Sequence, residues 1–249
     1  MHATHGATSK GDSHTETLVR TLITGVGAKG QVGEVVASTL ARRGDELVLV
    51  TRSGTEVEER VADLAAVGFG ARGYSCDLAD AIAVQELAAR VRRELGERID
   101  NVVHLAGGFA LSGPLADSDA AVVDRMMRIN YLTAFNVARS FLPAVRAAAG
   151  SFLFFASESV LEGARTKGSA AYSAAKSAVV ALMRSLADEG RELGVRANAL
   201  APSSIRTATN VSSMGPAMRY VEREEVAGAV AFLCSPQARA ITGQVIRLR

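Results

Sequence analysis

The regular alternation of short β-rich runs with longer helix-like segments constrains the fold of this chain most strongly. The β-rich runs lie at residues 18–25, 46–52, 71–77, 101–107, 151–157, 195–202 and 244–248. Stretches with helical periodicity lie between them, at residues 33–43, 56–66, 80–95, 117–148, 171–193 and 224–234. Alternating strands and helices form βαβ units, and continuous apolar runs are typical of strands buried on both faces. The sequence therefore predicts an α/β protein with a doubly wound, mostly parallel sheet and helices on both faces.

The domain organisation follows from the absence of any internal repeat, linker or change of composition after residue 17. Residues 18–249 are expected to form a single domain, which is long enough to bury one core. Residues 1–17 are polar and lack an apolar signal core, so a disordered N-terminal tail is expected there. His2, His5 and His14 in this segment have no carboxylate or cysteine at ligand spacing, so no metal site is expected.

Charge and cysteine content give no support to several classes of function. The net charge is +2, which provides no strong field for nucleic acid or acidic membranes. No run of about 18 apolar residues is present, so no membrane span is expected. Cys76 and Cys234 form neither a disulfide framework nor a CxxC zinc motif. A cytoplasmic location is expected, with no nucleic-acid or membrane partner.

A glycine-rich loop follows the first predicted strand in "ITGVGAKGQVGEVV". Gly25, Gly27 and Gly30 match GxGxxG, and Gly27, Gly30 and Gly33 match the same spacing. Glycine allows a tight turn and a close approach to a pyrophosphate, while the following helix offers free N–H groups. A strand before the loop and a helix after it are the context that a dinucleotide site requires. The loop therefore predicts a Rossmann-type, dinucleotide-binding fold; a glycine-rich turn without a ligand is the lesser alternative.

The end of the second predicted strand bears on which nicotinamide cofactor is preferred. An Asp or Glu there accepts the ribose 2′-OH of NAD, whereas an Arg accommodates the 2′-phosphate of NADP. This chain has Thr51 and Arg52, with no carboxylate before Glu56. A guanidinium pairs well with a phosphate, so NADP(H) is expected to be preferred over NAD(H). The alternative is that Arg52 is an ordinary exposed residue at a strand end.

A tyrosine and a lysine stand four residues apart in "SAAYSAAKSAVV", as Tyr172 and Lys176. Positions i and i+4 are neighbours on one helix face. A cation beside a phenol favours the phenolate and lowers its pKa, which makes a proton donor suited to neutral pH. The alternative is a buried tyrosine beside a lysine whose head reaches water. For the pair alone this alternative is favoured, and only the rest of the chain can change that.

The order of these motifs along the chain resembles that of the short-chain dehydrogenase/reductase family, in its compact single-domain form. The resemblance extends from about residue 18 to the end of the chain. It rests on "TGVGAKGQVG", "CDLAD", "HLAGG", "RINYLTAFNVA", "SES", "YSAAK", "NALAPSSIRT" and "AVAFLCSPQARAITGQ". Eight motifs in this order are unlikely to arise by accident, although none is decisive by itself.

The resemblance implies a catalytic set. Tyr172 would be the general acid/base, and Lys176 would lower its pKa and hold the nicotinamide ribose. Ser159, thirteen residues before the tyrosine, would hydrogen-bond the substrate oxygen. Ser157 is the competing serine, because "SES" offers two hydroxyls. Asn130 would complete a proton relay to the lysine through a water.

The resemblance also implies a set of cofactor contacts. It assigns them to Gly25, Gly27, Gly30, Gln31 and Val32 in the glycine loop, Thr51 and Arg52 after the second strand, Asp77 and Leu78 near the adenine, Ala106 and Gly107 along the cofactor, Tyr172 and Lys176 at the ribose, and Ile205 and Thr207 at the carboxamide.

Several positions depart from the family pattern. The glycine loop is two residues longer than usual, so Gly33 takes the last glycine position and Gln31 replaces the middle one. His104 precedes the "AGG" segment, where a structural, hydrogen-bonded histidine is favoured over a proton-transfer group. Ser203 replaces the glycine of the usual Pro-Gly. Glu158 is unusual so close to a carbonyl-reducing site, and the sequence suggests no role for it.

Substrate recognition in this family depends on the segment after "IRT", which is short here. We expect a small lid and a fairly open site, with a homodimer or homotetramer as the assembly. Met214, Met218 and Tyr220 would either line an apolar pocket or act as ordinary packing residues. The absence of a "DGG" tail indicates a changed tetramer geometry.

The expected function is that of an NADP(H)-dependent oxidoreductase interconverting a small carbonyl compound and its alcohol. The alternatives are a quinonoid reductase similar to dihydropteridine reductase, or a dinucleotide-binding sensor without turnover. "AGGFA" and "TATNVSSM" favour the first alternative, and Ser159 argues against it. The complete set of Ser159, Tyr172, Lys176 and Asn130 argues against the second. No GxSxG elbow is present, which argues against a serine hydrolase.

Overall fold

A sheet of seven parallel strands, in the order β3-β2-β1-β4-β5-β6-β7, organises the computed structural model, which describes residues 18–249. The strands are β1 (Arg20–Thr24), β2 (Glu46–Thr51), β3 (Ala71–Ser75), β4 (Asn101–His104), β5 (Ser151–Phe155), β6 (Arg196–Pro202) and β7 (Val245–Leu248). Every strand pair among the described residues is parallel, which confirms the predicted fold class.

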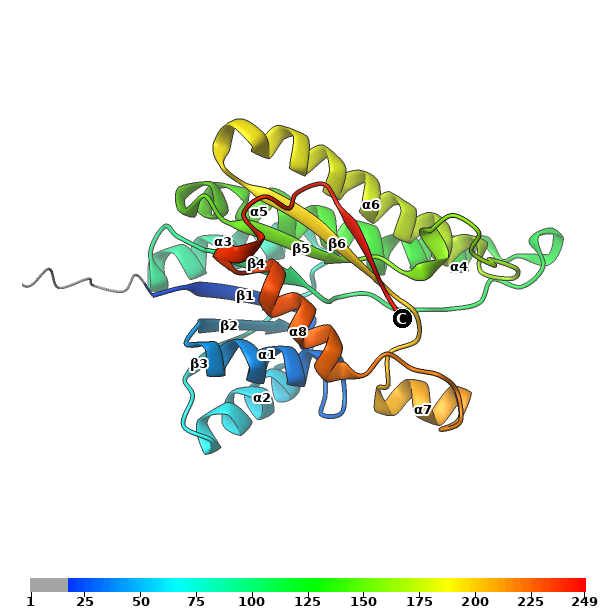
Figure 1. Ribbon diagram of the computed structural model, residues 1–249, viewed down its shortest axis with the longest axis horizontal. Helices are drawn as coiled ribbons and strands as arrows, with labels where there is room; N and C mark the ends of the chain where they lie inside the picture. Colours follow the sequence, from blue (N-terminus) through cyan, green and yellow to red (C-terminus); the bar gives the residue numbers. More distant parts are fainter. Residues whose placement is uncertain (1–17) are drawn as a thin grey trace, which may run out of the picture.

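Helices cover both faces of this sheet (Figure 1). One face carries α1 (Val32–Arg43), α2 (Gly54–Ala66) and α8 (Arg223–Leu233), and the other carries α3 (Ala81–Leu95), α5 (Thr133–Ala148) and α6 (Ala170–Gly190). Each layer contributes its apolar face to a separate core. In α1 these buried residues include Val36, Ala37, Leu40 and Ala41, which recur at the helical spacing that defines one stripe.

The helical stretch predicted over residues 117–148 is not one regular helix. It begins with α4 (Ala120–Met126), widens into a π-helical segment (Met127–Leu132) and continues as α5. Asn130 lies inside the π segment, and its amide nitrogen donates to the carbonyl of Met126 at 3.0 Å. π segments of this kind are frequent at functional sites.

The order of the strands places a ligand crevice at one edge of the sheet. From β1 the chain proceeds outward through β2 and β3, and from β4 it proceeds in the opposite direction to β7. β1 and β4 are therefore neighbours, with Thr24 opposite His104 at their carboxyl ends. Ligands of open α/β sheets bind where the strand order reverses. The glycine loop follows β1 at this point.

One helix at the same edge was not predicted from the sequence. This is α7 (Ala208–Met214), which lies in the short segment expected to form the lid. Its sequence, ATNVSSM, has no apolar periodicity and buries no residue. The helix begins because the Thr207 side chain caps it, accepting from the Asn210 N–H at 3.2 Å.

The remaining predictions concern the N-terminal tail, membrane spans and the cysteines. The tail predicted at residues 1–17, with His2, His5 and His14, lies outside the described residues. Within residues 18–249, no helix is both long and apolar enough to cross a bilayer. Cys76 and Cys234 are free and buried.

Candidate active site

A cleft of about 460 Å³ opens at the carboxyl ends of the central strands. This volume is within the range of small-molecule sites. Eight of the predicted cofactor residues line it: Gly25, Gly27, Thr51, Arg52, Asp77, Leu78, Ala106 and Gly107. The other predicted loop residues lie elsewhere: Gly30 and Gln31 contact α7, Thr207 caps α7, Ile205 accepts from Asn210, and Val32 begins α1.

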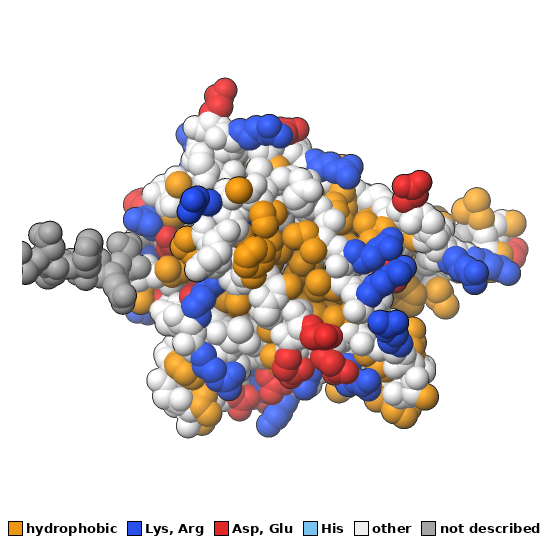
Figure 2. Space-filling model, in the orientation of Figure 1, with side chains coloured by type: hydrophobic (Ala, Val, Ile, Leu, Met, Phe, Trp, Pro, Cys, Tyr) orange, Lys and Arg blue, Asp and Glu red, His pale blue; other side chains and the backbone are white. Residues whose placement is uncertain are grey.

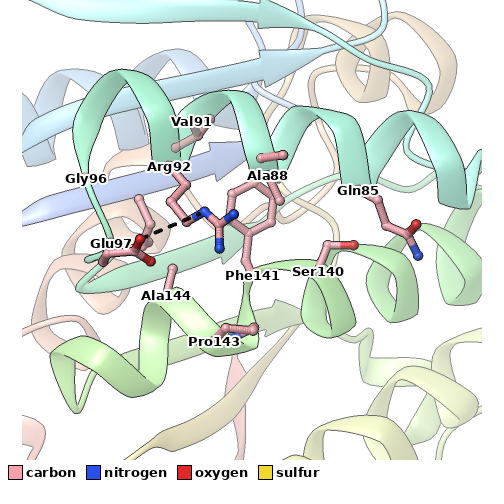
Figure 3. A pocket seen from close by; sticks show the side chains of 12 residues that line it. Gln85, Ala88, Val91, Arg92, Gly96, Glu97, Ser140, Phe141, Pro143 and Ala144 are labelled. Carbon is pink, nitrogen blue, oxygen red and sulfur yellow. Dashed lines mark ion pairs between the residues drawn. The ribbon is translucent and has the colours of Figure 1, made fainter.

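A second pocket of about 210 Å³ lies between α3 and α5 (Figure 3). Phe141 lies in it, and Arg92 is 3.9 Å from Glu97 at one end. No residue predicted from the sequence to bind substrate or cofactor lines this pocket. The cleft at the reversal of strand order is therefore the candidate site.

The glycine loop is held against its neighbours so closely that side chains would not fit. A Cβ atom on Gly25 would lie 2.4 Å from the backbone nitrogen of Ala106, and the φ angle of Gly25 is +76°. A Cβ on Gly33 would lie 2.1 Å from the carbonyl oxygen of Val26. This contact agrees with the assignment of Gly33 as the last glycine of the longer loop. The N-cap residue of α1, Gln31, makes no side-chain cap, so N–H groups of the first turn remain available to an anion.

Two opposite charges border the cleft at the end of β2. Arg52 is exposed there and lines the cleft. The carboxylate of Glu56 also reaches this position, because the first turn of α2 brings it back to accept from the Thr51 hydroxyl at 3.4 Å. The sequence placed Glu56 too far along the chain to matter, and only the turn into α2 reveals it.

The π segment contributes cleft residues that sequence reasoning missed. Arg125, Arg128, Ile129 and Thr133 line the cleft from α4, the π segment and the start of α5. Arg128 lies 3.6 Å from the carboxylate of Asp77, the residue predicted near the adenine. A pattern interpreted as a regular helix carries no signal for this placement.

Tyr172 and Lys176 lie together on the first turns of α6, as their spacing predicts. The Lys176 ammonium is 5.9 Å from the centroid of the Tyr172 ring. It is buried and donates to the carbonyl of Phe155 at 2.8 Å. Burial without a carboxylate partner lowers the pKa of Lys176 to about 8.

The pKa of Tyr172 differs from the sequence-based prediction. Burial raises the pKa of its phenol above the ordinary value, and the Ser157 hydroxyl acts in the opposite direction. Lys176 is not among the groups that shift it, and its ammonium donates to the Phe155 carbonyl. The predicted lowering of the phenol pKa is therefore not found here, because burial dominates the shift.

The two candidate serines have different surroundings. Ser157 lies beside the Tyr172 phenol, and its hydroxyl accepts from the Ser159 N–H at 3.2 Å. The Ser159 hydroxyl oxygen is buried and has no hydrogen-bond partner among residues 18–249. A buried hydroxyl without a partner is uncommon and calls for a ligand or other explanation. Phe109, which the sequence did not suggest, places its ring edge-on to Tyr172 with centroids 4.9 Å apart.

Asn130 and Lys176 converge on the backbone of Gly107. A Cβ on Gly107 would lie 2.6 Å from the Asn130 side-chain oxygen and 3.2 Å from the Lys176 ammonium. Asn130 is fully buried, and its amide exchanges hydrogen bonds with the backbone of Gly108. Three of the four residues of the predicted catalytic set, Asn130, Tyr172 and Lys176, thus approach the cofactor-lining segment or one another.

His104 is the structural histidine that its strand position predicts. It is buried between two threonine hydroxyls, at 2.8 Å from that of Thr24 and 3.3 Å from that of Thr133. Burial lowers the pKa of His104 to about 3, and the nearby Lys176 adds to this effect. The imidazole is therefore neutral at physiological pH and links the end of β1 to α5.

The structure gives Glu158 a role that the sequence did not suggest. Its carboxylate accepts from the Arg249 guanidinium at 3.0 Å and lies 4.0 Å from that of Arg247. The Glu158 side chain, between the two serines, thus points toward β7 and the residue after it, where two arginines neutralise its carboxylate. This arrangement explains how a carboxylate is tolerated in "SES".

The segment that follows β6, which was expected to form a small lid over an open site, is partly packed against the rest of the protein. Ile205 forms an isolated parallel bridge with Val221. Tyr220 is buried, and its hydroxyl donates to the Gly215 carbonyl at 2.6 Å, so it is a packing residue. Met214 and Met218 each remain 42% exposed.

Comparisons with known proteins agree with this fold. The family model described as Enoyl-(Acyl carrier protein) reductase matches residues 25–248. A tropinone reductase homolog of Arabidopsis thaliana is 30% identical over 90% of this chain and 72% of its own. The 2-(S)-hydroxypropyl-CoM dehydrogenase 3 of Xanthobacter autotrophicus is 31% identical over 89% of this chain and 91% of its own.

Solved structures show the same similarity. A gluconate 5-dehydrogenase from Burkholderia cenocepacia, in complex with NADP and tartrate, superimposes with a TM-score of 0.83 at 27% identity, covering 92% of this chain and 93% of its own. A short-chain type dehydrogenase/reductase from Mycobacterium ulcerans superimposes with a TM-score of 0.82 at 30% identity, covering 92% and 88%. With the parallel sheet and the glycine loop, these matches establish that the chain belongs to the short-chain dehydrogenase/reductase family of oxidoreductases.

Proposed function

We propose that this protein is an NADP(H)-dependent oxidoreductase that interconverts a carbonyl compound and its alcohol through Asn130, Ser159, Tyr172 and Lys176. The observation that carries the proposal is the convergence of the Asn130 oxygen and the Lys176 ammonium on the backbone of Gly107, with Tyr172 beside the lysine. Residues 18–249 would form one catalytic domain around this site.

The glycine loop and the start of α1, beside the cleft, fit a nicotinamide dinucleotide. Gly25 and Gly33 leave room for no side chain, and the first turn of α1 offers free N–H groups to a pyrophosphate. When bound, the cofactor supplies the hydride to a carbonyl carbon, or accepts it from an alcohol. Lys176 would hold the nicotinamide ribose, and Ile205 and Thr207 would hold the carboxamide.

The proton moves separately, through side chains of this chain. During reduction, the Tyr172 phenol would donate its proton to the oxygen that becomes the alcohol, and during oxidation the phenolate would take it back. The free hydroxyl of Ser159 would hydrogen-bond the same oxygen, while the nearby Ser157 hydroxyl would hold the phenol. Asn130 and Lys176 would return the proton from solvent. Positioned proton transfer of this kind contributes about 10²–10⁴-fold.

The preference for NADP(H) rests on Arg52 at the end of β2. Its guanidinium is exposed at the edge of the cleft, where it can pair with a 2′-phosphate. The similar gluconate 5-dehydrogenase was solved in complex with NADP. Glu56 opposes this preference, because its carboxylate reaches Thr51 at the same place. We therefore expect Arg52→Ala to reduce kcat/KM for NADPH about tenfold or more, and Glu56→Gln to raise it. A higher kcat/KM for NADH than for NADPH in the wild-type protein would refute the preference.

The substrate class is a small or medium carbonyl/alcohol pair, in keeping with the hydroxypropyl compound and the gluconate in the names of two similar dehydrogenases. The test is a screen at the NADPH absorbance band near 340 nm, with aldehydes, ketones, quinones and quinonoid pterins as substrates. Turnover of pterins alone would favour the dihydropteridine-reductase alternative. Cofactor binding without turnover of any compound would favour the sensor.

The role of Tyr172 is tested by its phenylalanine variant. Tyr172→Phe is expected to lose about 10²–10⁴-fold in kcat and to keep its affinity for NADPH, whereas Lys176→Ala should impair both. Tyr74→Phe is the matched control, because Tyr74 is a buried tyrosine on β3 that pairs with Glu94 away from the cleft. Turnover by Tyr172→Phe at the wild-type rate would exclude the proposed proton donor.

Self-association in the cytoplasm completes the proposal. Figure 2 shows apolar side chains gathered in the middle of the face that carries β7 and α8. Phe232 of α8 is 47% exposed, and β7 is an edge strand of the sheet. A homodimer or homotetramer would cover such a surface. Light scattering after gel filtration tests this, and a monomer at micromolar concentration would refute it.

A further inference from the structure

The glycine loop makes direct contacts with α7, a helix far away in the sequence (Figure 1). The Ala208 N–H donates to the Gly30 carbonyl at 3.1 Å. The Gln31 side-chain amide donates to the Thr209 hydroxyl at 3.0 Å. A Cβ on Gly30 would lie 3.0 Å from that of Ala208. The loop and the first turn of α7 therefore pack closely together.

One of these contacts arises from the chain's own departures from the family pattern. The loop is two residues longer than usual, and Gln31 stands at the position of the middle glycine. A glycine at that position has no side chain and could not reach Thr209. The hydrogen bond between Gln31 and Thr209 is thus a feature of this sequence.

α7 depends on such polar contacts, because it has no apolar anchor. None of its residues is buried, and the side chain of Met214 is 42% exposed. Just beyond its carboxyl end, the Gly215 carbonyl accepts from the Tyr220 hydroxyl at 2.6 Å, and the same hydroxyl lies 3.2 Å from the Asn210 carbonyl within the helix. At its amino end, the hydrogen bonds to the glycine loop fix the helix in place.

The loop itself is fixed at the point of contact. The Gly30 N–H donates to the Glu34 carboxylate at 2.8 Å, and Glu34 pairs with Arg223 at 3.3 Å. The Gly30 carbonyl accepts a hydrogen bond from the Ala208 N–H. With both its backbone groups engaged and a φ of +82°, Gly30 cannot shift without moving α7.

We propose that Gln31 is a positioning residue that couples the phosphate-binding loop to α7, so that binding of the dinucleotide and closure of α7 over the substrate favour each other. This inference rests on the proposed function for the identity of the two ligands. α7 directly follows Ile205 and Thr207, the residues proposed to hold the carboxamide, so a loop fixed by the pyrophosphate would hold the helix beside the reacting end. Linkage requires the coupling to be reciprocal.

The first experiment measures the coupling in a double-mutant cycle. Gln31→Leu and Thr209→Val are each expected to raise the KM of the carbonyl substrate about two- to tenfold, as loss of one net hydrogen bond allows. Kcat and the NADPH Kd should change less. The double variant should be no worse than either single one. Thr209→Ser keeps the hydroxyl and should match the wild type, and Gln85→Leu on α3 is a control for the substitution itself.

The second experiment needs no substrate. Trypsin can cut after Arg219, which is exposed just beyond α7. NADPH is expected to slow this cleavage severalfold in the wild-type protein and in Gln85→Leu, but little in Gln31→Leu. Equal protection in wild type and Gln31→Leu, or additive effects in the cycle, would overturn the coupling. A loss confined to the NADPH Kd would do so too, because Gln31 would then serve only the phosphate.

The two proposals fail in distinguishable ways. If no carbonyl compound is turned over, the proposed function fails, and the protection of Arg219 by NADPH still tests the coupling. If NADPH does not bind at all, the proposed function again fails. The comparison of cleavage rates without nucleotide then decides whether Gln31 holds α7: faster cleavage of Gln31→Leu supports the contact, and an equal rate refutes it.

Discussion

Replacing the buried lysine should change the pH dependence of stability in a predictable direction. Lys176 has its pKa lowered from 10.5 to about 8, because its ammonium is buried without a carboxylate partner. Since about 1.4 kcal/mol corresponds to each pH unit, the buried charge costs the folded state about 3 kcal/mol at neutral pH. Lys176→Met removes this cost, but it leaves the Phe155 carbonyl, now bound at 2.8 Å, without its donor, at about 1–3 kcal/mol. The variant should therefore be inactive and about as stable as the wild type at neutral pH, or slightly more stable.

The sign of the pH effect follows from proton binding. Between about 8 and 10.5 the folded state binds fewer protons at Lys176 than the unfolded state, so wild-type stability rises with pH through this window. The methionine variant lacks this gain. Its free energy of unfolding relative to the wild type should therefore fall by about 2 kcal/mol between about pH 7 and pH 9.5, while the cost at the Phe155 carbonyl stays constant and cancels.

Urea unfolding at the two pH values measures this difference directly. Both proteins should carry Tyr172→Phe, which removes titration of the nearby phenol from the comparison. A difference in the free energy of unfolding that stays the same at both pH values, within about 0.5 kcal/mol, would refute the reasoning. It would mean that the Lys176 ammonium is solvated and titrates in its ordinary range.

Three further substitutions test the packing of the site. Gly33→Ala should destabilise the protein by about 2–3 kcal/mol, because its Cβ would lie 2.1 Å from the Val26 carbonyl oxygen. Gly228→Ala is the control, since it lies in open space on α8 and should be neutral or stabilising by up to about 1 kcal/mol. Equal shifts of the melting temperature in the two variants would contradict the close contact between Gly33 and Val26. Gly107→Ala should keep the fold, by circular dichroism, and lose about 10²-fold or more in kcat, since its Cβ would lie 2.6 Å from the Asn130 oxygen; normal turnover would show that this oxygen is not required in place. Because the pKa of His104 falls from 6.5 to about 3 on folding, the unfolded state binds the extra proton below 6.5 and stability drops as pH falls. Wild type should lose about 2 kcal/mol more than His104→Gln between about pH 7 and pH 5 in urea unfolding, and parallel losses would mean that the imidazole is accessible to solvent.

The sequence by itself determined the elements and their order. The strand at residues 101–104 and the helix at residues 33–43 were predicted to within a few residues, because apolar periodicity and glycine placement act over one or two turns of chain. The glycine loop, the Tyr172–Lys176 pair and the alternation of strands and helices are likewise local. They sufficed to predict a parallel α/β fold with a dinucleotide-binding loop after its first strand.

Only the tertiary structure decided which irregular elements border the site, which charged groups pair there and how its pKa values shift. The π segment around Asn130 and the short helix α7 carry no periodic signal, since contacts with Gly108 and with the glycine loop support them. The contact of Glu56 with the Thr51 hydroxyl and the pairing of Glu158 with Arg249 join residues that the sequence shows only as separate. The pKa of Tyr172 rises because the phenol is buried, and that burial depends on the whole packed environment. Local pattern specifies where a residue stands in an element, whereas its charge state and partners depend on what the rest of the chain packs against it.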